Sequence, residues 1–325
     1  MYVVTLQAFK GVKVSHSARC KFMNPKPIVA VHGGAGVWRG LDVEVESIRR
    51  ALRDAVISGL EASKTGDCVD MVVEAIALLE DSGLFNAGVG STLDYLGGIS
   101  MDAGLMTSRG RAGAVAAVSY PRNPIKLARI VLERTPHVIL AGHYADELAR
   151  RMGLEKHPGP HPRVIVRWRS LREDPSVSKW ILERVKAART LGFDTVGAVA
   201  LDNQGCLAAG ASTGGVAMKL PGRVGDSPIP GAGFYANEKV AVSATGIGET
   251  ILMSMSSLRV AQLYELLGNL KESLDIVVRE HTLKWGSGTL GLIALSRRGE
   301  VEASHNAEAM PWAYATLGEE PRIYF

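Results

Sequence analysis

Cysteine, aromatic residues and net charge are all scarce in this 325-residue sequence. The three cysteines, Cys20, Cys68 and Cys206, are isolated and lack the spacing of zinc ligands, so neither disulfides nor zinc is expected. A formal charge of +4 does not indicate nucleic-acid binding, which requires a clustered basic face. Long apolar runs are also missing, so no membrane span is expected. These absences favour a cytoplasmic protein that binds neither nucleic acid nor membrane.

The rest of the composition is that of an ordinary globular protein, with 46% hydrophobic and 22% charged residues. The 36 glycines, against 6% aromatics, indicate tight turns and a closely packed backbone. Basic residues are scattered among polar ones in residues 1–26 without an apolar centre, which predicts a flexible arm and not a secretory signal. Length alone allows two domains or one large α/β domain.

The periodicity of apolar residues predicts both helices and strands. A strand at 28–31 ends in the sequence HGGAG at 32–36, and Asp67 is expected to cap a helix. Helices are predicted at 42–64, after Asp67, and at 124–133, 142–152, 248–266 and 272–284. Strands are predicted at 112–119, 196–201, 206–212, 239–245, 289–296 and 300–305. Periodicity alone indicates an α/β fold with at least two packed layers.

The segment at residues 153–194 differs from its surroundings. Pro158, Pro160 and Pro162 are expected to break regular structure, and a cluster of arginines precedes a predicted helix at 176–190. Such a basic cluster is usually a solvated surface. We interpret the segment as an irregular linker between two halves, each with strands and a pair of helices.

The most informative motif is DTVGAVALD at residues 194–202, which places Thr195 at the start of a strand. A threonine hydroxyl becomes a useful nucleophile when the residue is N-terminal, because its own α-amine, with a pKa near ~8, then acts as the base. Exposing that amine requires cleavage after Asp194, and the irregular linker suits such a cut. The alternative is that Thr195 merely begins a strand, where β-branched residues are favoured.

A charged pair follows in the loop KLPGRVGDS at residues 219–227. The guanidinium of Arg223 can bind a carboxylate through two parallel hydrogen bonds, and Asp226 can accept from an ammonium group. Together they suit the two charged groups of an amino acid. The alternative is a surface ion pair.

These segments, with STGG at 212–215 and FNAGVG at 85–90, resemble the plant-type asparaginase and isoaspartyl peptidase family of N-terminal nucleophile hydrolases. The resemblance runs from about Ile28 to the C-terminus, without the linker. It implies one domain over 27–325 with the four-layer αββα sandwich fold. It also implies autocleavage between Asp194 and Thr195 into an α subunit and a β subunit (Thr195–Phe325), and a homodimer of cleaved protomers.

The resemblance assigns a role to each site residue. Thr195 is the nucleophile, Thr213 orients it, and the Thr245 hydroxyl with the Gly246 N–H forms the oxyanion hole, at a helix start that suits negative charge. The substrate-binding residues implied are Arg223, Asp226, Thr245, Gly246, Gly248 and Asn86. The turn at 32–36 is expected to be architectural.

No cofactor is expected for catalysis, but the resemblance implies a structural sodium ion. Backbone carbonyls are suitable ligands because hard cations prefer oxygen. The carbonyls implied are those of Leu79, Glu80, Ser82, Phe85, Ala87 and Val89.

The expected reaction is hydrolysis of β-aspartyl amides, in L-asparagine, in β-aspartyl dipeptides or in both. Three positions differ from the family pattern near the pocket, Ile247, Ala307 and Ala309, so the preferred leaving group stays open. Asp194, where glycine is common, resembles glycosylasparaginase, and a protein-cleaving threonine aspartase is a third alternative.

Two other motifs suggest different classes. The sequence GASTG around Ser212 matches the nucleophile motif of serine hydrolases, with His281 or His305 as a triad partner, but the prolines that follow exclude the required helix. The sequence GSGTLG at 286–291 matches a dinucleotide fingerprint but precedes a strand. A non-catalytic binding protein is a further alternative.

Overall fold

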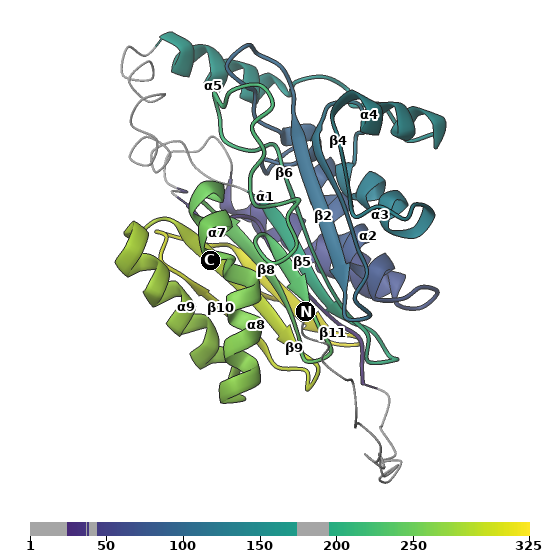
Figure 1. Cartoon of the computed structure of the whole chain (residues 1–325), viewed down its shortest axis with the longest axis vertical. Helices are drawn as coiled ribbons and strands as arrows, with labels where there is room; N and C mark the ends of the chain where they lie inside the picture. The colour runs from purple at the N-terminus through teal and green to yellow at the C-terminus, as the bar shows by residue number, and fades with distance from the viewer. Residues whose placement is uncertain (1–24, 37, 39–43, 174–194) are drawn as a thin grey trace, which may run out of the picture.

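Two β-sheets packed face to face form the centre of the molecule, and helices cover their outer faces (Figure 1). The computed structural model describes residues 25–36, 38, 44–173 and 195–325. Over these residues the larger sheet has the strand order β12 (Arg322–Tyr324), β11 (Trp312–Thr316), β1 (Ile28–His32), β5 (Val196–Leu201), β6 (Leu207–Thr213), β2 (Met101–Thr107), β3 (Ala112–Val118), β4 (Ile139–Ala141). The smaller sheet has the order β10 (Val301–His305), β9 (Leu290–Ser296), β8 (Val240–Gly246), β7 (Phe234–Ala236). Neighbouring strands are antiparallel except for β3 and β4.

The helices complete a four-layer αββα sandwich, as the sequence resemblance implies (Figure 1). Helices α1 (Val45–Ala62), α2 (Cys68–Asp81) and α3 (Pro124–Arg134) pack on the larger sheet. Helices α8 (Ser256–Leu267) and α9 (Leu270–Trp285) pack on the smaller one. The shorter elements are η1 (Gly88–Gly90), α4 (Gly142–Arg151), α5 (Pro162–Glu173) and α7 (Gly248–Ser254).

Three hydrophobic cores fill the spaces between the four layers. In β5, Val196 and Ala198 belong to the core under α1 and α2, whereas Val199 and Leu201 face the second sheet. Strand β8 alternates in the same way, with Val242 packed under the outer helices. Because successive residues of a strand point to opposite faces, both faces of these strands are buried. This accounts for the small apolar residues that fill them.

The start of α2 confirms the expected cap. The Asp67 carboxylate accepts the N–H of Val69 at 2.8 Å, and the Asp70 carboxylate accepts the N–H of Asp67 at 2.8 Å. The helix predicted over 248–266 is wrong in one respect. Met255 has a left-handed backbone (φ 46°) and divides this segment into α7 and α8.

Part of the expected irregular linker is a helix. Pro162 begins α5, because proline in the first helical turn lacks only an N–H that would have no helical partner. The Arg163 guanidinium donates to the carbonyl of Gly83, and Trp168 Nε1 donates to the Asp94 carbonyl at 2.8 Å. The predicted helix at 176–190, Asp194 and the N-terminal arm up to residue 24 lie outside the described residues.

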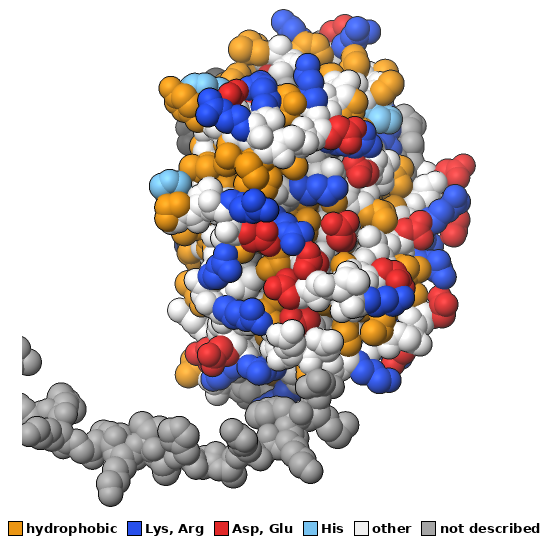
Figure 2. All heavy atoms as spheres, turned by 90° about the vertical axis from the view of Figure 1, so that its right-hand side faces the viewer, with side chains coloured by type: hydrophobic (Ala, Val, Ile, Leu, Met, Phe, Trp, Pro, Cys, Tyr) orange, Lys and Arg blue, Asp and Glu red, His pale blue; other side chains and the backbone are white. Residues whose placement is uncertain are grey.

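Charged side chains of both signs are interspersed on the face of the molecule that Figure 2 shows, without a single continuous basic area. Across the described ranges, no helix is both long enough and apolar enough to cross a lipid bilayer.

Candidate active site

The adjacent strands β5 and β6 bring two threonines together. Val196 pairs with Ser212, so Thr195 lies beside Thr213 at the same end of the sheet. The Thr195 hydroxyl donates to Thr213 Oγ1 at 3.1 Å, and the N–H of Gly215 donates to the same oxygen at 2.9 Å. Both threonines are buried. The predicted nucleophile is therefore held by the predicted orienting residue.

The inner face of β8 lies against this pair. A side chain at Gly197, two residues after Thr195, would collide with Ser243 Oγ and His32 Nε2, so only glycine permits the close approach. Ser243 Oγ donates to the Gly210 carbonyl at 3.0 Å, and His32 Nε2 lies 3.0 Å from Ser243 Oγ. Complete burial lowers the pKa of His32 to about 3, so this histidine is neutral.

Thr245 follows Ser243 on the same face, at the point where β8 leads into α7. Its Oγ1 accepts the N–H of Ala35 at 3.3 Å, which leaves the hydroxyl hydrogen free to donate elsewhere. Gly246 has a φ of 138°, and a side chain there would collide with the Thr289 carbonyl. The turn at 32–36, expected to be architectural, thus also contacts the predicted oxyanion threonine.

The predicted clamp residues converge at the first residue of α7. A Cβ atom at Gly248 would lie 2.6 Å from Arg223 Nη2 and 2.9 Å from Asp226 Oδ1. A Cβ atom at Gly215 would lie 3.2 Å from Arg223 Nη1, which connects the clamp to the threonine pair. The structure therefore brings Thr195, Thr213, Thr245, Gly246, Arg223, Asp226 and Gly248 into one region.

The guanidinium of Arg223 is paired with a residue that the sequence did not single out. Its Nε and Nη2 donate to the two carboxylate oxygens of Glu249, each at 2.9 Å. The Arg223 side chain is 15% exposed and that of Glu249 is 54% exposed. The geometry is the two-pronged binding of a carboxylate that was expected for a substrate.

Asp226 is buried, and among the described residues its Oδ2 has no hydrogen-bond partner. Burial raises the pKa of Asp226 to about 7, although the positive charge of Arg223 opposes this. An unpartnered buried carboxylate oxygen is costly. An ammonium group next to Arg223 would supply the missing donors.

Lys219 is a further buried group that the sequence did not indicate, since a lysine in a Pro/Gly-rich loop is typical of surfaces. Its Nζ donates to the carbonyls of Ser100 at 2.5 Å and Gly214 at 2.8 Å. Burial lowers the pKa of Lys219 to about 8. Asn86 holds the same strand end from the other side, because its Nδ2 donates to the Gly215 carbonyl at 2.5 Å.

The loop predicted to hold sodium is tightly wound around η1. The Leu79 carbonyl accepts the Ser82 hydroxyl at 2.7 Å, and the Phe85 carbonyl accepts the N–H of Ala87 at 2.9 Å. A Cβ atom at Gly90 would collide with the Phe85 carbonyl oxygen. Each carbonyl keeps a second lone pair, so the oxygen-rich loop fits a hard cation, and the site stays a prediction.

The rival motifs lack their required geometry. Ser212 lies at the end of β6, where its hydroxyl donates to Glu80 Oε1 at 2.6 Å, and a long loop follows. Of the two candidate histidines, His281 Nε2 contacts Thr250 Oγ1 at 3.0 Å and His305 Nδ1 contacts the Ala307 carbonyl at 3.1 Å. The glycine-rich sequence at 286–291 leads into β9, not into a helix.

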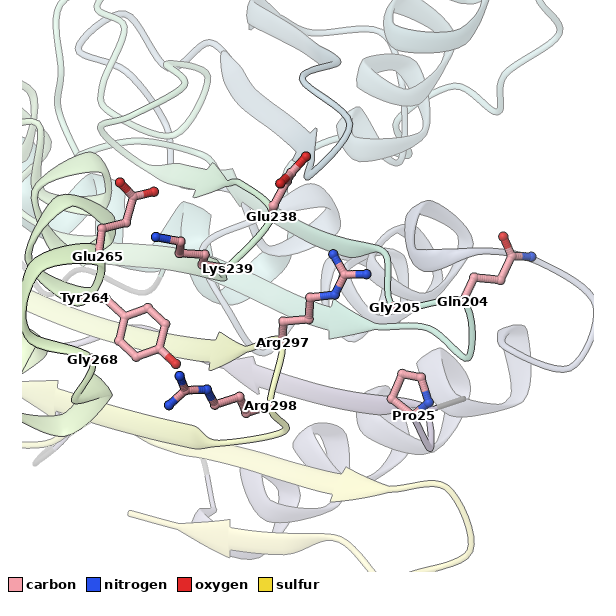
Figure 3. A pocket seen from close by; sticks show the side chains of 10 residues that line it. All are labelled: Pro25, Gln204, Gly205, Glu238, Lys239, Tyr264, Glu265, Gly268, Arg297 and Arg298. Atoms are coloured by element: carbon pink, nitrogen blue, oxygen red, sulfur yellow. The ribbon is translucent and has the colours of Figure 1, made fainter. Parts of the chain in front are cut away.

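A pocket of about 420 Å³ lies away from these residues (Figure 3). Gln204, Lys239, Arg297 and Arg298 line it from the turns β5–β6, β7–β8 and β9–β10. Thr195 precedes the first residue of β5, whereas the β5–β6 turn follows its last residue. Thr245 lies near the end of β8, whereas the β7–β8 turn precedes its first residue. A strand of six residues spans roughly 20 Å, so this pocket is separate from the threonine pair.

Comparison with known proteins shows the family of the chain. A family model described as asparaginase matches residues 25–324. This chain belongs to the asparaginase family. The plant-type L-asparaginase of Pyrobaculum calidifontis is 46% identical to this chain over 299 residues, which cover 90% of this chain and 97% of that protein. The isoaspartyl peptidase of Salmonella typhimurium is 39% identical over 305 residues, 91% of this chain and 97% of that protein. The isoaspartyl peptidase of Escherichia coli K12 is 38% identical over 305 residues, covering 91% and 95%.

Proposed function

We propose that this chain is a self-processing threonine hydrolase that cleaves β-aspartyl amide bonds and releases L-aspartate. The substrates proposed are L-asparagine and β-aspartyl dipeptides, in line with the names of its relatives. One observation carries the proposal. The hydroxyl pair of Thr195 and Thr213 lies beside a clamp in which Arg223 and Asp226 converge.

Cleavage before Thr195 is compatible with an intact fold. Strand β5, the first strand of the second half, pairs on one side with β1 of the first half and on the other side with β6 of the second half. Strand β6 in turn pairs with β2 of the first half. Because strands of the two halves pair with each other within one sheet, at β11–β1, β1–β5 and β6–β2, the two fragments would remain hydrogen-bonded to each other after the cut. The free α-amine of Thr195 would then act as the general base.

Substrate binding would use the clamp. The α-carboxylate of the aspartyl group would bind the guanidinium of Arg223, in the manner in which Glu249 binds it in this structure. The α-ammonium group would donate to Asp226 and favour its ionised form. Both interactions position the side-chain carbonyl of the substrate for attack.

In the reaction, the Thr195 amine takes the hydroxyl proton and the oxygen attacks the substrate carbonyl carbon. The Thr245 hydroxyl and the Gly246 N–H donate to the oxyanion, where one such donor lowers the barrier by roughly 3–4 kcal/mol. The amine then protonates the departing ammonia or amino acid. Water attacks the resulting ester, which regenerates Thr195 and releases aspartate.

The decisive test compares Thr195→Ala with Thr195→Ser. Thr195→Ala should remain one intact chain without activity, because both processing and turnover need the hydroxyl. Thr195→Ser retains a hydroxyl and should yield two fragments that meet at Asp194/Thr195 and a measurable rate. Mass spectrometry and aspartate release measure the two outcomes. An active, processed Thr195→Ala enzyme would refute the assignment.

Asp194 favours one alternative substrate class, the glycosylated asparagine of glycosylasparaginase, and a threonine aspartase acting on proteins is another. Parallel assays of L-asparagine, a β-aspartyl dipeptide and a glycosylasparagine on processed enzyme distinguish them. A structural sodium ion at the loop of residues 79–90 is part of the proposal. So are the homodimer of cleaved protomers and the cytoplasmic location. The ion would only stiffen the loop that carries Asn86.

A further inference from the structure

We propose that Cys68 and Cys206 form a disulfide that covalently joins the two halves of the chain. Cys68 is the first residue of α2, and Cys206 immediately precedes β6. They are 138 residues apart in sequence, yet their Sγ atoms lie 2.6 Å apart. Both side chains are buried, so each sulfur faces the other and not solvent. Both thiols are free in this structure, but two cysteines that are isolated along the sequence are neighbours in the fold.

Asp202 holds the backbones of both cysteines in place. Its Oδ2 accepts the N–H of Cys68 at 3.2 Å, and its Oδ1 accepts the N–H of Cys206 at 2.8 Å. One carboxylate thus ties the start of α2 to the turn before β6. Helix α2 also packs directly against β5 and β6. The sulfurs are brought together by the packing of these elements, and a bond of about 2.0 Å between them needs only a small further approach.

A metal site made of the same residues fits less well. Ligand atoms of Cys68, Asp202 and Cys206 all lie within 4.8 Å of one another. Two thiolates bound to tetrahedral zinc at about 2.3 Å each lie about 3.8 Å apart, well above the observed separation. Both oxygens of Asp202 already accept backbone N–H groups. The geometry favours a sulfur–sulfur bond.

The bond would form by thiol–disulfide exchange with a small-molecule or protein disulfide as the oxidant. Either thiol can attack first, and the balance of atoms and electrons is the same; Cys206 is taken here as the first. Its thiolate attacks the oxidant and releases one thiol. Cys68 then attacks the mixed disulfide at Cys206 and releases the second thiol. The two cysteines lose two electrons and two protons, which the oxidant takes up. Burial of both sulfurs places this step during folding.

The consequence rests on the proposed function. If the chain is cut before Thr195, Cys68 belongs to the first fragment and Cys206 to the second. The disulfide would then link the fragments covalently in addition to the sheet that they share. A cut chain would stay a single molecule even when unfolded, as long as no reductant is present.

The test is the mass of the denatured protein, folded in the presence of oxidised glutathione and analysed with and without dithiothreitol. Without dithiothreitol, we expect one species, two hydrogen atoms lighter than the sum of the reduced fragments. With dithiothreitol, two fragments should separate. If self-cleavage does not occur, the intact chain should still be two hydrogen atoms lighter than its reduced form, so the two proposals are tested separately.

Variants locate the bond. Cys68→Ser and Cys206→Ser should each give separate fragments without reductant, whereas Cys20→Ser, which removes the third cysteine of the sequence, should keep them linked. The wild-type measurement decides the matter even if one variant does not fold. Three results would overturn the proposal: alkylation of both thiols in the unreduced denatured protein, a glutathione adduct on Cys206, or one tightly bound zinc ion per chain.

Discussion

Asp226 should bind the substrate at a cost to the stability of the folded chain. The substitution Asp226→Asn should therefore raise the stability and lower the activity. Burial raises the pKa of this carboxyl from 3.8 to about 7, with the opposing effect of Arg223 already included. Because 1.36 kcal/mol corresponds to one pH unit, the ionised carboxylate costs about 4 kcal/mol at pH 8 relative to the unfolded chain. Asparagine has a similar shape and carries no charge, so the substitution should remove most of this cost.

The sign of the pH dependence follows from the raised pKa. Between pH 4 and pH 7 Asp226 binds more protons in the folded state than in the unfolded state, so the contribution of Asp226 to the stability of the wild-type chain falls as the pH rises through this range. The stabilisation by Asp226→Asn should therefore be largest at pH 8 and nearly vanish at pH 4. Thermal unfolding should be measured in the Thr195→Ala background, where one uncut chain unfolds. The shift expected at pH 8 is several degrees.

Two comparisons make this test specific. Asp54→Asn changes an aspartate whose side chain is 48% exposed, and it should leave the melting temperature nearly unchanged at both pH values. In the processed enzyme, Asp226→Asn should reduce kcat/KM by roughly 10- to 100-fold, because a charged hydrogen bond to the substrate is worth about 1.5–3 kcal/mol. A melting-temperature difference that is independent of pH would refute the reasoning on burial.

Two further predictions concern the groups around the threonine pair. Arg223→Lys keeps the charge but loses the two-pronged geometry, so KM should rise with a fall in kcat/KM of roughly 10- to 100-fold. Unchanged kinetics would remove Arg223 from the clamp. Lys219→Met removes the donor to the carbonyls of Ser100 and Gly214 and leaves both buried without it, which should cost about 1–3 kcal/mol of stability. Because Gly214 follows Thr213 at the end of β6, kcat should fall by a larger factor than KM changes. A variant that is processed normally and has the kcat of the wild-type enzyme would contradict a positioning role for Lys219.

Most helices and strands could be predicted from the sequence because local patterns determine them. The cap at Asp67 and the apolar periodicity of α1 depend on neighbours within a few residues. Strand β2 was not predicted, because Asp102 and Gly104 interrupt its apolar pattern. Asp102 is nevertheless buried, where it accepts the N–H of Ala117 at 2.8 Å. Pairing with β3 and β6, not local propensity, forms that strand.

The sequence by itself determined which residues are candidates for the chemistry, because the motifs around Thr195, Thr213, Arg223 and Asp226 are short and contiguous. Only the tertiary structure decided what surrounds them. Three contacts join segments that are distant in the sequence. They are the ion pair of Arg223 with Glu249, the hydrogen bond from the buried Lys219 to the Ser100 carbonyl, and the contact between Cys68 and Cys206. The physical reason is that burial and hydrogen bonding depend on which strands become neighbours. Strand β5, for example, lies beside β1, which is more than 160 residues earlier in the sequence, and no local pattern indicates that pairing.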